Sequence, residues 1–228
     1  MACLARVSGA PLRGRSRYRG GTLGVRRTHS VPSVDEFDGG FGWIADEFLE
    51  RCSHALVADG RVWLIDPVAA HGIEERIRAA GEPAGVIQLL DRHSRDCTQV
   101  AARLGVAHHM LPQQVAGAPF EFLTMRDTRW WKEVALWWAE RRVLVCADAL
   151  GTARYYCARG ERIALHPFMR LSPPRDQLER LAPERILCGH GEGIHAGAEA
   201  ALREALRTAR RRIPAQLAAS VRAWRQER

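Results

Sequence analysis

The chain has 228 residues, of which 46% are hydrophobic and 26% charged. This is the composition of one globular domain with a sizeable core. No apolar run approaches the roughly 18 residues that a membrane-spanning helix needs, and residues 1–30 lack the apolar core of a secretory signal. We therefore expect a cytoplasmic protein without a membrane association.

The formal net charge of +8 is unevenly distributed. Residues 1–30 hold seven arginines and no acid, and residues 201–228 hold eight arginines and two acids, which leaves the centre mildly acidic. The first segment is rich in Gly, Ser and Arg, so we expect a disordered basic extension over residues 1–30. For residues 1–30 a flexible extension is favoured over a nucleic-acid-binding arm. For the carboxyl-terminal helices nucleic-acid binding is the less favoured reading, because no aromatic readers are interleaved with their arginines.

The elements follow in chain order. Residues 34–51 suggest an edge strand and a short helix, and the Asp59-Gly60 pair between apolar runs predicts a hairpin, because Gly accepts the positive φ of a tight turn. A surface helix is expected over residues 72–80, a buried strand over 85–90 and a helix over 96–104. Two basic helices, the second starting at Pro214, are expected to end the chain.

The stretch Leu-Leu-Asp-Arg-His-Ser-Arg-Asp-Cys at residues 89–97 lies on the turn between the buried strand and its helix. Ligands in α/β proteins gather outside the carboxyl ends of strands, so we expect the functional site here. The six cysteines show no Cys-X-X-Cys spacing and are expected to be reduced core thiols. Cys97 is the exception, since a helix start is expected to lower the pKa of its thiol.

This stretch resembles the Thr-His-X-His-X-Asp-His motif of the metallo-β-lactamase-fold hydrolases. Other segments resemble that family in the same order: Leu-Ile-Asp-Pro at 64–67, the run into Cys-Ala-Asp at 146–148, and Cys-Gly-His-Gly at 188–191. The resemblance implies an α/β protein, a four-layered αββα sandwich of the metallo-β-lactamase type, formed by a single domain over residues 31–228.

The motif aligns with the family in two registers. In the first, which we prefer because it keeps the carboxylate next to the helix start, Asp96 matches the Asp, Cys97 replaces the last His, and Arg92 and Ser94 replace the first two. In the second, Asp91 replaces the first His, His93 matches the second, and Arg95 and Asp96 occupy the last two positions.

Further along the chain, Asp148 and His190 match the family's bridging aspartate and last histidine. The candidate metal ligands are therefore Asp91, His93, Asp96, Cys97, Asp148 and His190. Arginine has no lone pair for a metal, and a third arginine, Arg129, falls where the family places another histidine. Arg92, Arg95 and Arg129 are expected either to form salt bridges with the acids or to clamp an anion.

The resemblance implies a hydrolase for a small-molecule substrate, with an altered metal site that one zinc or other divalent ion could occupy alone. The alternative is a non-catalytic binding protein that has kept the fold and lost its metal.

Overall fold

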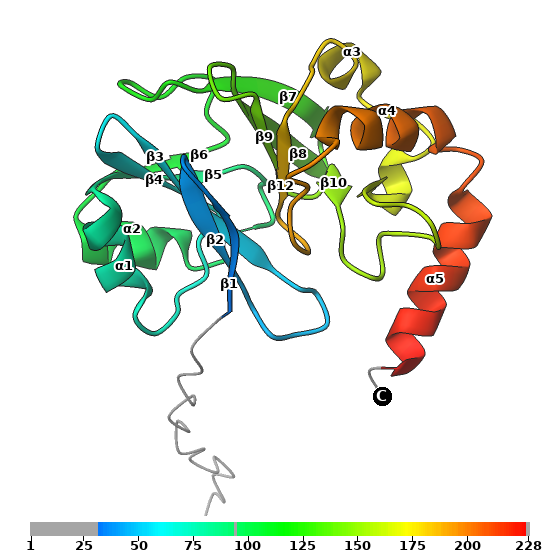
Figure 1. Cartoon of the computed structure of the whole chain (residues 1–228), viewed down its shortest axis with the longest axis horizontal. Coiled ribbons are helices and arrows are strands. Elements are labelled where there is room, and N and C mark those ends of the chain that lie inside the picture. The colour runs from blue at the N-terminus through cyan, green and yellow to red at the C-terminus, as the bar shows by residue number, and fades with distance from the viewer. Residues whose placement is uncertain (1–31, 94, 227–228) are drawn as a thin grey trace, which may run out of the picture.

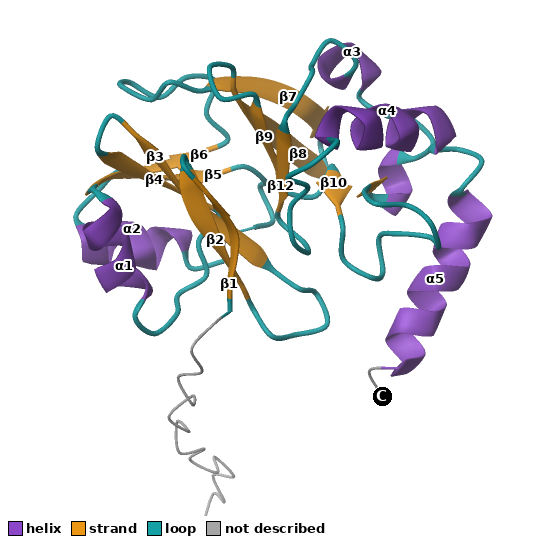
Figure 2. Cartoon of the chain, in the orientation of Figure 1, coloured by secondary structure: helices purple, strands orange, loops and turns teal. Residues whose placement is uncertain are grey.

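The computed structural model describes residues 32–93 and 95–226. The predicted basic extension and Ser94 lie outside these residues. Within them, two β-sheets face each other and helices cover both outer faces, giving the order helix, sheet, sheet, helix (Figures 1 and 2).

The first sheet has six strands in the order of the sequence. Strands β1 to β4 are antiparallel, while β5 and β6 run parallel to β4. Its strands are β1 (Ser33–Phe37), β2 (Gly40–Ile44), β3 (Cys52–Ala58), β4 (Arg61–Ile65), β5 (Glu82–Gln88) and β6 (His108–Met110). Helices α1 (Ile73–Ala80) and α2 (Cys97–Leu104) connect the parallel strands and cover the outer face (Figure 1).

The second sheet has four strands in the order β12-β9-β8-β7. Its strands are β7 (Glu121–Thr128), β8 (Trp131–Trp138), β9 (Val143–Cys146) and β12 (Arg185–Cys188), and a two-stranded ribbon pairs β10 (Leu150–Gly151) with β11 (Ala164–Leu165). The remaining helices are η1 (Pro167–Met169), α3 (Arg175–Leu178), α4 (Ala198–Thr208) and α5 (Ile213–Gln226). Leu202 and Leu206 of α4 join the core at the outer face of this sheet.

Alternation along β4 shows how the layers form. Val62 and Leu64 pack under α1 and α2, whereas Trp63 and Ile65 enter the core between the sheets. Successive side chains of a strand point to opposite faces, so a strand covered on both faces is apolar throughout.

The predicted hairpin is confirmed. Asp59 and Gly60 have φ values of 50° and 72°, the positive values that a type I′ turn requires at both central positions. The helix expected within residues 34–51 is wrong, because Phe41 and Trp43 alternate on a second strand and a turn follows it. No described helix is both long enough and apolar enough to cross a membrane.

Candidate metal centre

Three predicted ligands meet at the carboxyl ends of three strands. His93 lies on the turn after β5, Asp148 follows β9, and His190 follows β12. Strands β9 and β12 are parallel neighbours, so the residues beyond their ends lie at the same sheet edge. We call these three side chains the His–Asp–His centre.

Three atoms of this centre converge. Oδ1 of Asp148 is 3.1 Å from Nε2 of His93 and 3.1 Å from Nε2 of His190. The two Nε2 atoms are 3.3 Å apart. The three side chains are largely buried, with 7–14% of each exposed.

The opposite ring nitrogens fix the state of both histidines. Nδ1 of His190 is 2.7 Å from the carbonyl oxygen of Leu49, and Nδ1 of His93 is 3.4 Å from a carboxylate oxygen of Asp66. Both partners are acceptors, so each Nδ1 carries the proton and donates it. In a neutral ring the other nitrogen, Nε2, then presents a lone pair. Both lone pairs belong to atoms of the converging set.

Asp148 supplies the negative charge. Its Oδ1 is buried and accepts no hydrogen bond of good geometry within the described residues, although both imidazoles are close. Burial raises the pKa of Asp148, but His190 and His93 lower it by more, so the carboxyl is held ionised. Burial and Arg95 lower the pKa of His93, and Asp148 and Asp66 outweigh them and raise it.

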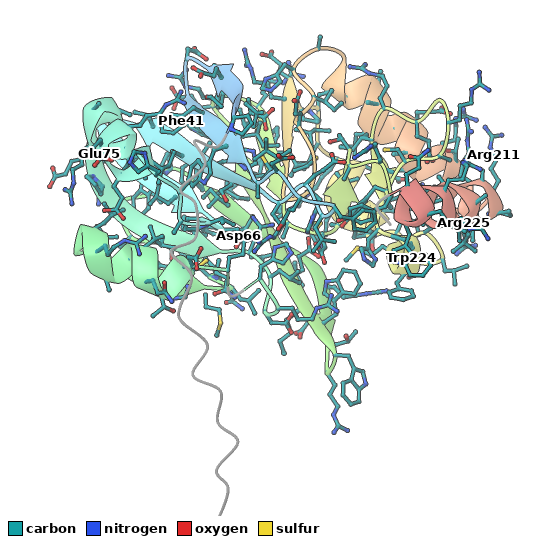
Figure 3. All side chains as sticks on the ribbon, turned by 90° about the horizontal axis from the view of Figure 1, so that it is seen from below. Phe41, Asp66, Glu75, Arg211, Trp224 and Arg225 are labelled. Atoms are coloured by element: carbon teal, nitrogen blue, oxygen red, sulfur yellow. The ribbon has the colours of Figure 1, made fainter. Side chains whose placement is uncertain are left out.

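Two acids that the sequence did not single out support the centre. Asp66, after β4, accepts a hydrogen bond from the backbone N–H of Leu89 at 3.0 Å through its other oxygen, which aims the carboxylate at His93. Figure 3 places Asp66 near the middle of the molecule. The signal in the sequence for Asp66 was the Leu-Ile-Asp-Pro segment at residues 64–67.

The second of these acids is Glu133 of β8, which is fully buried. Its carboxylate accepts hydrogen bonds from the backbone N–H groups of Asp148 and Ala149 and from Nε1 of Trp131. Burial and the charge of Asp148 raise the pKa of Glu133 to about 7, although these donors act in the opposite direction. The sequence carried one signal for this buried acid, which is that Glu133 stands near the start of an otherwise apolar strand.

The three arginines have different surroundings. Arg95 donates to the backbone carbonyls of Cys52, Asp66 and Gly189, and so ties together the ends of β3, β4 and β12. Its guanidinium therefore bonds to the main chain, not to the acids. The backbone bonds of Arg95 differ from both roles expected for it, because they involve neither a carboxylate nor an anionic ligand.

Arg92 is half exposed at the edge of the centre, with Nη2 3.9 Å from Oδ2 of Asp148 and its guanidinium over the ring of Trp131. Arg129 is exposed on the turn between β7 and β8, where it stacks on Trp130. Arg92 therefore forms the expected ion pairs with Asp91 and Asp148, at 3.7 and 3.9 Å, whereas no described ion pair joins Arg129 to the candidate acids.

The remaining predicted ligands point elsewhere. Asp96 accepts a hydrogen bond from the N–H of Ala69 at 2.8 Å. Cys97 is buried with its Sγ near the carbonyl of His93, and burial raises the pKa of its thiol, so the expected lowering is wrong. Asp91 accepts a hydrogen bond from the N–H of Lys132 through Oδ2. Its Oδ1 has no hydrogen-bond partner in the described part of the chain and lies 3.7 Å from Nε of Arg92. Among the described residues of the motif, His93 is the one whose side chain lies beside both Asp148 and His190.

The donor set fits a divalent ion. Two imidazole nitrogens and a carboxylate oxygen are donors that zinc and related ions accept. Three lone-pair atoms about 3 Å apart repel one another unless a cation or a proton lies between them. Among the described residues, Oδ1 of Asp148 has no hydrogen-bond partner. The ligand atoms of these three side chains all lie within 4.8 Å of one another, which is close enough to hold a single ion.

No family model matches the chain, and no curated protein matches it in sequence. Solved structures do match its fold. The DIM-1 metallo-beta-lactamase has a TM-score of 0.57 at 11% identity, covering 79% of this chain and 97% of that one. A putative diflavin flavoprotein fragment from Nostoc sp. PCC 7120 gives 0.57 at 12% identity, with 81% and 98% covered.

The metallo-beta-lactamase FIM-1 from Pseudomonas aeruginosa, in its mono-zinc form, gives 0.55 at 10% identity, with 81% and 96% covered. The sheet order, the covering helices and these likenesses agree. The chain has the metallo-β-lactamase fold, an αββα sandwich with its His–Asp–His centre at the strand ends.

Proposed function

We propose that the protein is a metal-dependent hydrolase that holds one divalent ion, zinc or a similar metal, at His93, Asp148 and His190. The observation that carries this proposal is the convergence of two Nε2 lone pairs and an ionised carboxylate oxygen on one another. The mono-zinc form of FIM-1 provides a precedent for a single zinc ion in this fold.

A second ion is not part of the proposal, because Arg95 occupies a ligand position of the motif in the second register. The positively charged guanidinium of Arg95 donates hydrogen bonds to three backbone carbonyls beside the site. A guanidinium cannot lose its proton to become a metal ligand. In this proposal the guanidinium of Arg95 supplies a positive charge where a second metal ion would otherwise supply it.

Each residue has a defined task. His93, Asp148 and His190 would hold the divalent ion, which would act as a Lewis acid and lower the pKa of a bound water molecule. Asp66 and the carbonyl of Leu49 hold His93 and His190 in the tautomer that presents Nε2. Glu133 positions Asp148 through the backbone N–H groups at residues 148 and 149. Arg92, half exposed beside Asp148, is placed to bind an anionic group of a small-molecule substrate.

The test is metal content followed by hydrolysis. The full chain is loaded with zinc, desalted and analysed, in parallel with His190→Ala and with the control His71→Ala, whose histidine is exposed before α1. We expect His190→Ala to hold one equivalent less than the other two proteins. Equal metal content in all three would contradict the proposal.

The loaded protein is then given chromogenic ester, phosphodiester and lactam substrates. Hydrolysis that disappears in His190→Ala and persists in His71→Ala would support the enzyme. The alternative is a binding protein on the same fold, which the weak ion pairs of the exposed Arg92 with Asp91 and Asp148 favour, since they leave a cation for a ligand. A native chain that retains far less than one equivalent of metal and turns over none of these substrate classes would favour that alternative, in which the metal has been lost.

A further inference from the structure

A second group of metal-ligating side chains lies away from the His–Asp–His centre. Asp35 of β1 and both Cys52 and His54 of β3 are buried together. Oδ2 of Asp35 is 3.0 Å from Nε2 of His54, and Sγ of Cys52 is 3.5 Å from that nitrogen and 3.7 Å from that oxygen. We call these three side chains the Asp35 cluster.

The backbone is shaped around this cluster. Asp35 has a φ of 55° at the irregularity in the pairing of β1 with β2, a conformation that costs about 1 kcal/mol or more in a residue other than Gly. Cys52 and His54 are two apart on a strand and so share one face. A Cβ at Gly42 of β2 would lie 3.0 Å from His54 and 3.3 Å from Asp35, so the glycine leaves room for the pair.

The second oxygen of Asp35 is held from the other side. Oδ1 accepts hydrogen bonds from the backbone N–H of Gly193 at 2.7 Å and from Nε2 of His195 at 2.8 Å. These donors, on the loop after β12, fix the carboxylate with Oδ2 facing Cys52 and His54. Such outer contacts are what orients the ligands of protein metal sites.

We propose that the Asp35 cluster is a second metal site, which binds zinc or a similar thiophilic divalent ion through Oδ2 of Asp35, Sγ of Cys52 and Nε2 of His54. Tetrahedral zinc with bonds of about 2.0–2.3 Å places its ligand atoms roughly 3.3–3.6 Å apart. The three distances of 3.0, 3.5 and 3.7 Å lie around that range. A water molecule would complete the tetrahedral set of ligands.

His195, whose Nε2 is 2.8 Å from Oδ1 of Asp35, connects the cluster to the surface. His195, with 35% of its side chain exposed, also lines a surface pocket of about 340 Å³ with Arg142 and Glu184. Thiolate and imidazole together favour zinc over magnesium or calcium. On binding, the Cys52 thiol loses its proton to solvent, as a coordinating thiol does.

A nucleophilic Cys-His-Asp triad does not fit the same residues. In such a triad the histidine meets the nucleophile and the acid through different nitrogens, whereas Sγ of Cys52 and Oδ2 of Asp35 both meet Nε2 of His54. Burial and the charge of Asp35 also raise the pKa of Cys52 well above its usual value, so without a cation the thiol is not an activated nucleophile.

The inference is independent of the proposed hydrolase, and sulfur separates the two sites. The His–Asp–His centre contains no thiol, so a thiolate-to-cobalt charge-transfer band in the near ultraviolet reports only a site with cysteine. The reduced, metal-free full chain is titrated with cobalt(II) chloride, and bound cobalt is counted after desalting. We expect the band to saturate at one equivalent of thiolate-bound cobalt.

Four variants assign the band. Cys52→Ser and His54→Ala should lose it together with one equivalent of cobalt, whereas Cys157→Ser, at a half-buried thiol that is the more accessible to stray metal, should keep it. His93→Ala should keep the band while losing the other equivalent. No band in the native chain at saturating cobalt, or a band that survives in Cys52→Ser, would overturn the proposal. The native-chain result decides the matter even if Cys52→Ser does not fold.

Discussion

Arg95 allows the sharpest test of how the site is held. Arg95→Met removes a guanidinium that donates to the carbonyls of Cys52, Asp66 and Gly189. A hydrogen bond from a charged donor contributes about 1.5–3 kcal/mol, and an abandoned buried carbonyl costs about 1–3 kcal/mol. Discounting for partial exposure and for water reaching some carbonyls, we expect the free energy of unfolding to fall by about 3–6 kcal/mol.

Arg92→Met is the matched control, since it is the same chemical change three residues away. Arg92 is half exposed, and its ion pairs with Asp91 and Asp148 are 3.7 and 3.9 Å long, so its loss should cost under about 1 kcal/mol. Arg95→Lys should fall in between, because one ammonium cannot reach three carbonyls in the geometry of a guanidinium.

Urea unfolding followed by tryptophan fluorescence measures all three variants. If Arg95→Met were within about 1 kcal/mol of the native chain, the three carbonyl bonds would not be stabilising the strand ends, and the reasoning would fail. A loss equal in Arg92→Met and Arg95→Met would point to general charge effects instead.

Three further predictions concern groups around the sites. Asp66→Asn should weaken zinc binding about 10–100-fold in a competition titration, because the amide N–H₂ opposes the Nδ1–H of His93; unchanged affinity would remove its tautomer-fixing role. The pKa of Glu133 is raised from 4.5 to about 7 in the fold, so its stabilising contribution is full below pH 4.5 and is lost as the pH rises through 7. The shift in pKa corresponds to about 3 kcal/mol. The free energy of unfolding of the native chain, measured relative to that of Glu133→Gln, should therefore be about 3 kcal/mol lower at pH 8 than at pH 5. A difference between the two proteins that does not change with pH would contradict this prediction. Gly191→Ala should lower the free energy of unfolding by more than about 2 kcal/mol, since its Cβ would lie 2.3 Å from Oγ1 of Thr152 at a φ of 84°. The control Gly60→Ala, where a Cβ would have nothing within 4 Å, should lower it by about 1 kcal/mol. Equal losses in the two variants would show that the contact with Thr152 is relieved.

Local patterns in the sequence determined much of the fold. The Asp59-Gly60 turn, the apolar run into Gln88 and the helical spacing after Asp96 depend on short-range sterics and on the periodicity of burial, which neighbouring residues express directly. They also predicted that the site lies beyond a strand end, where His93 is found. The short helix expected within residues 34–51 was wrong, because the apolar residues there suit either a helix or a strand when they are read alone.

Only the tertiary structure decided which side chains meet. The motif at residues 91–97 offered two registers, and local sequence could not tell which of its side chains lies beside Asp148 and His190, because those two residues follow other strands. Arg95 bonds to carbonyls from three strands, and Asp35 meets His195 across 160 positions of sequence. Periodicity tells which face of an element is buried but not which residue of another element lies opposite, and a metal site depends on that convergence.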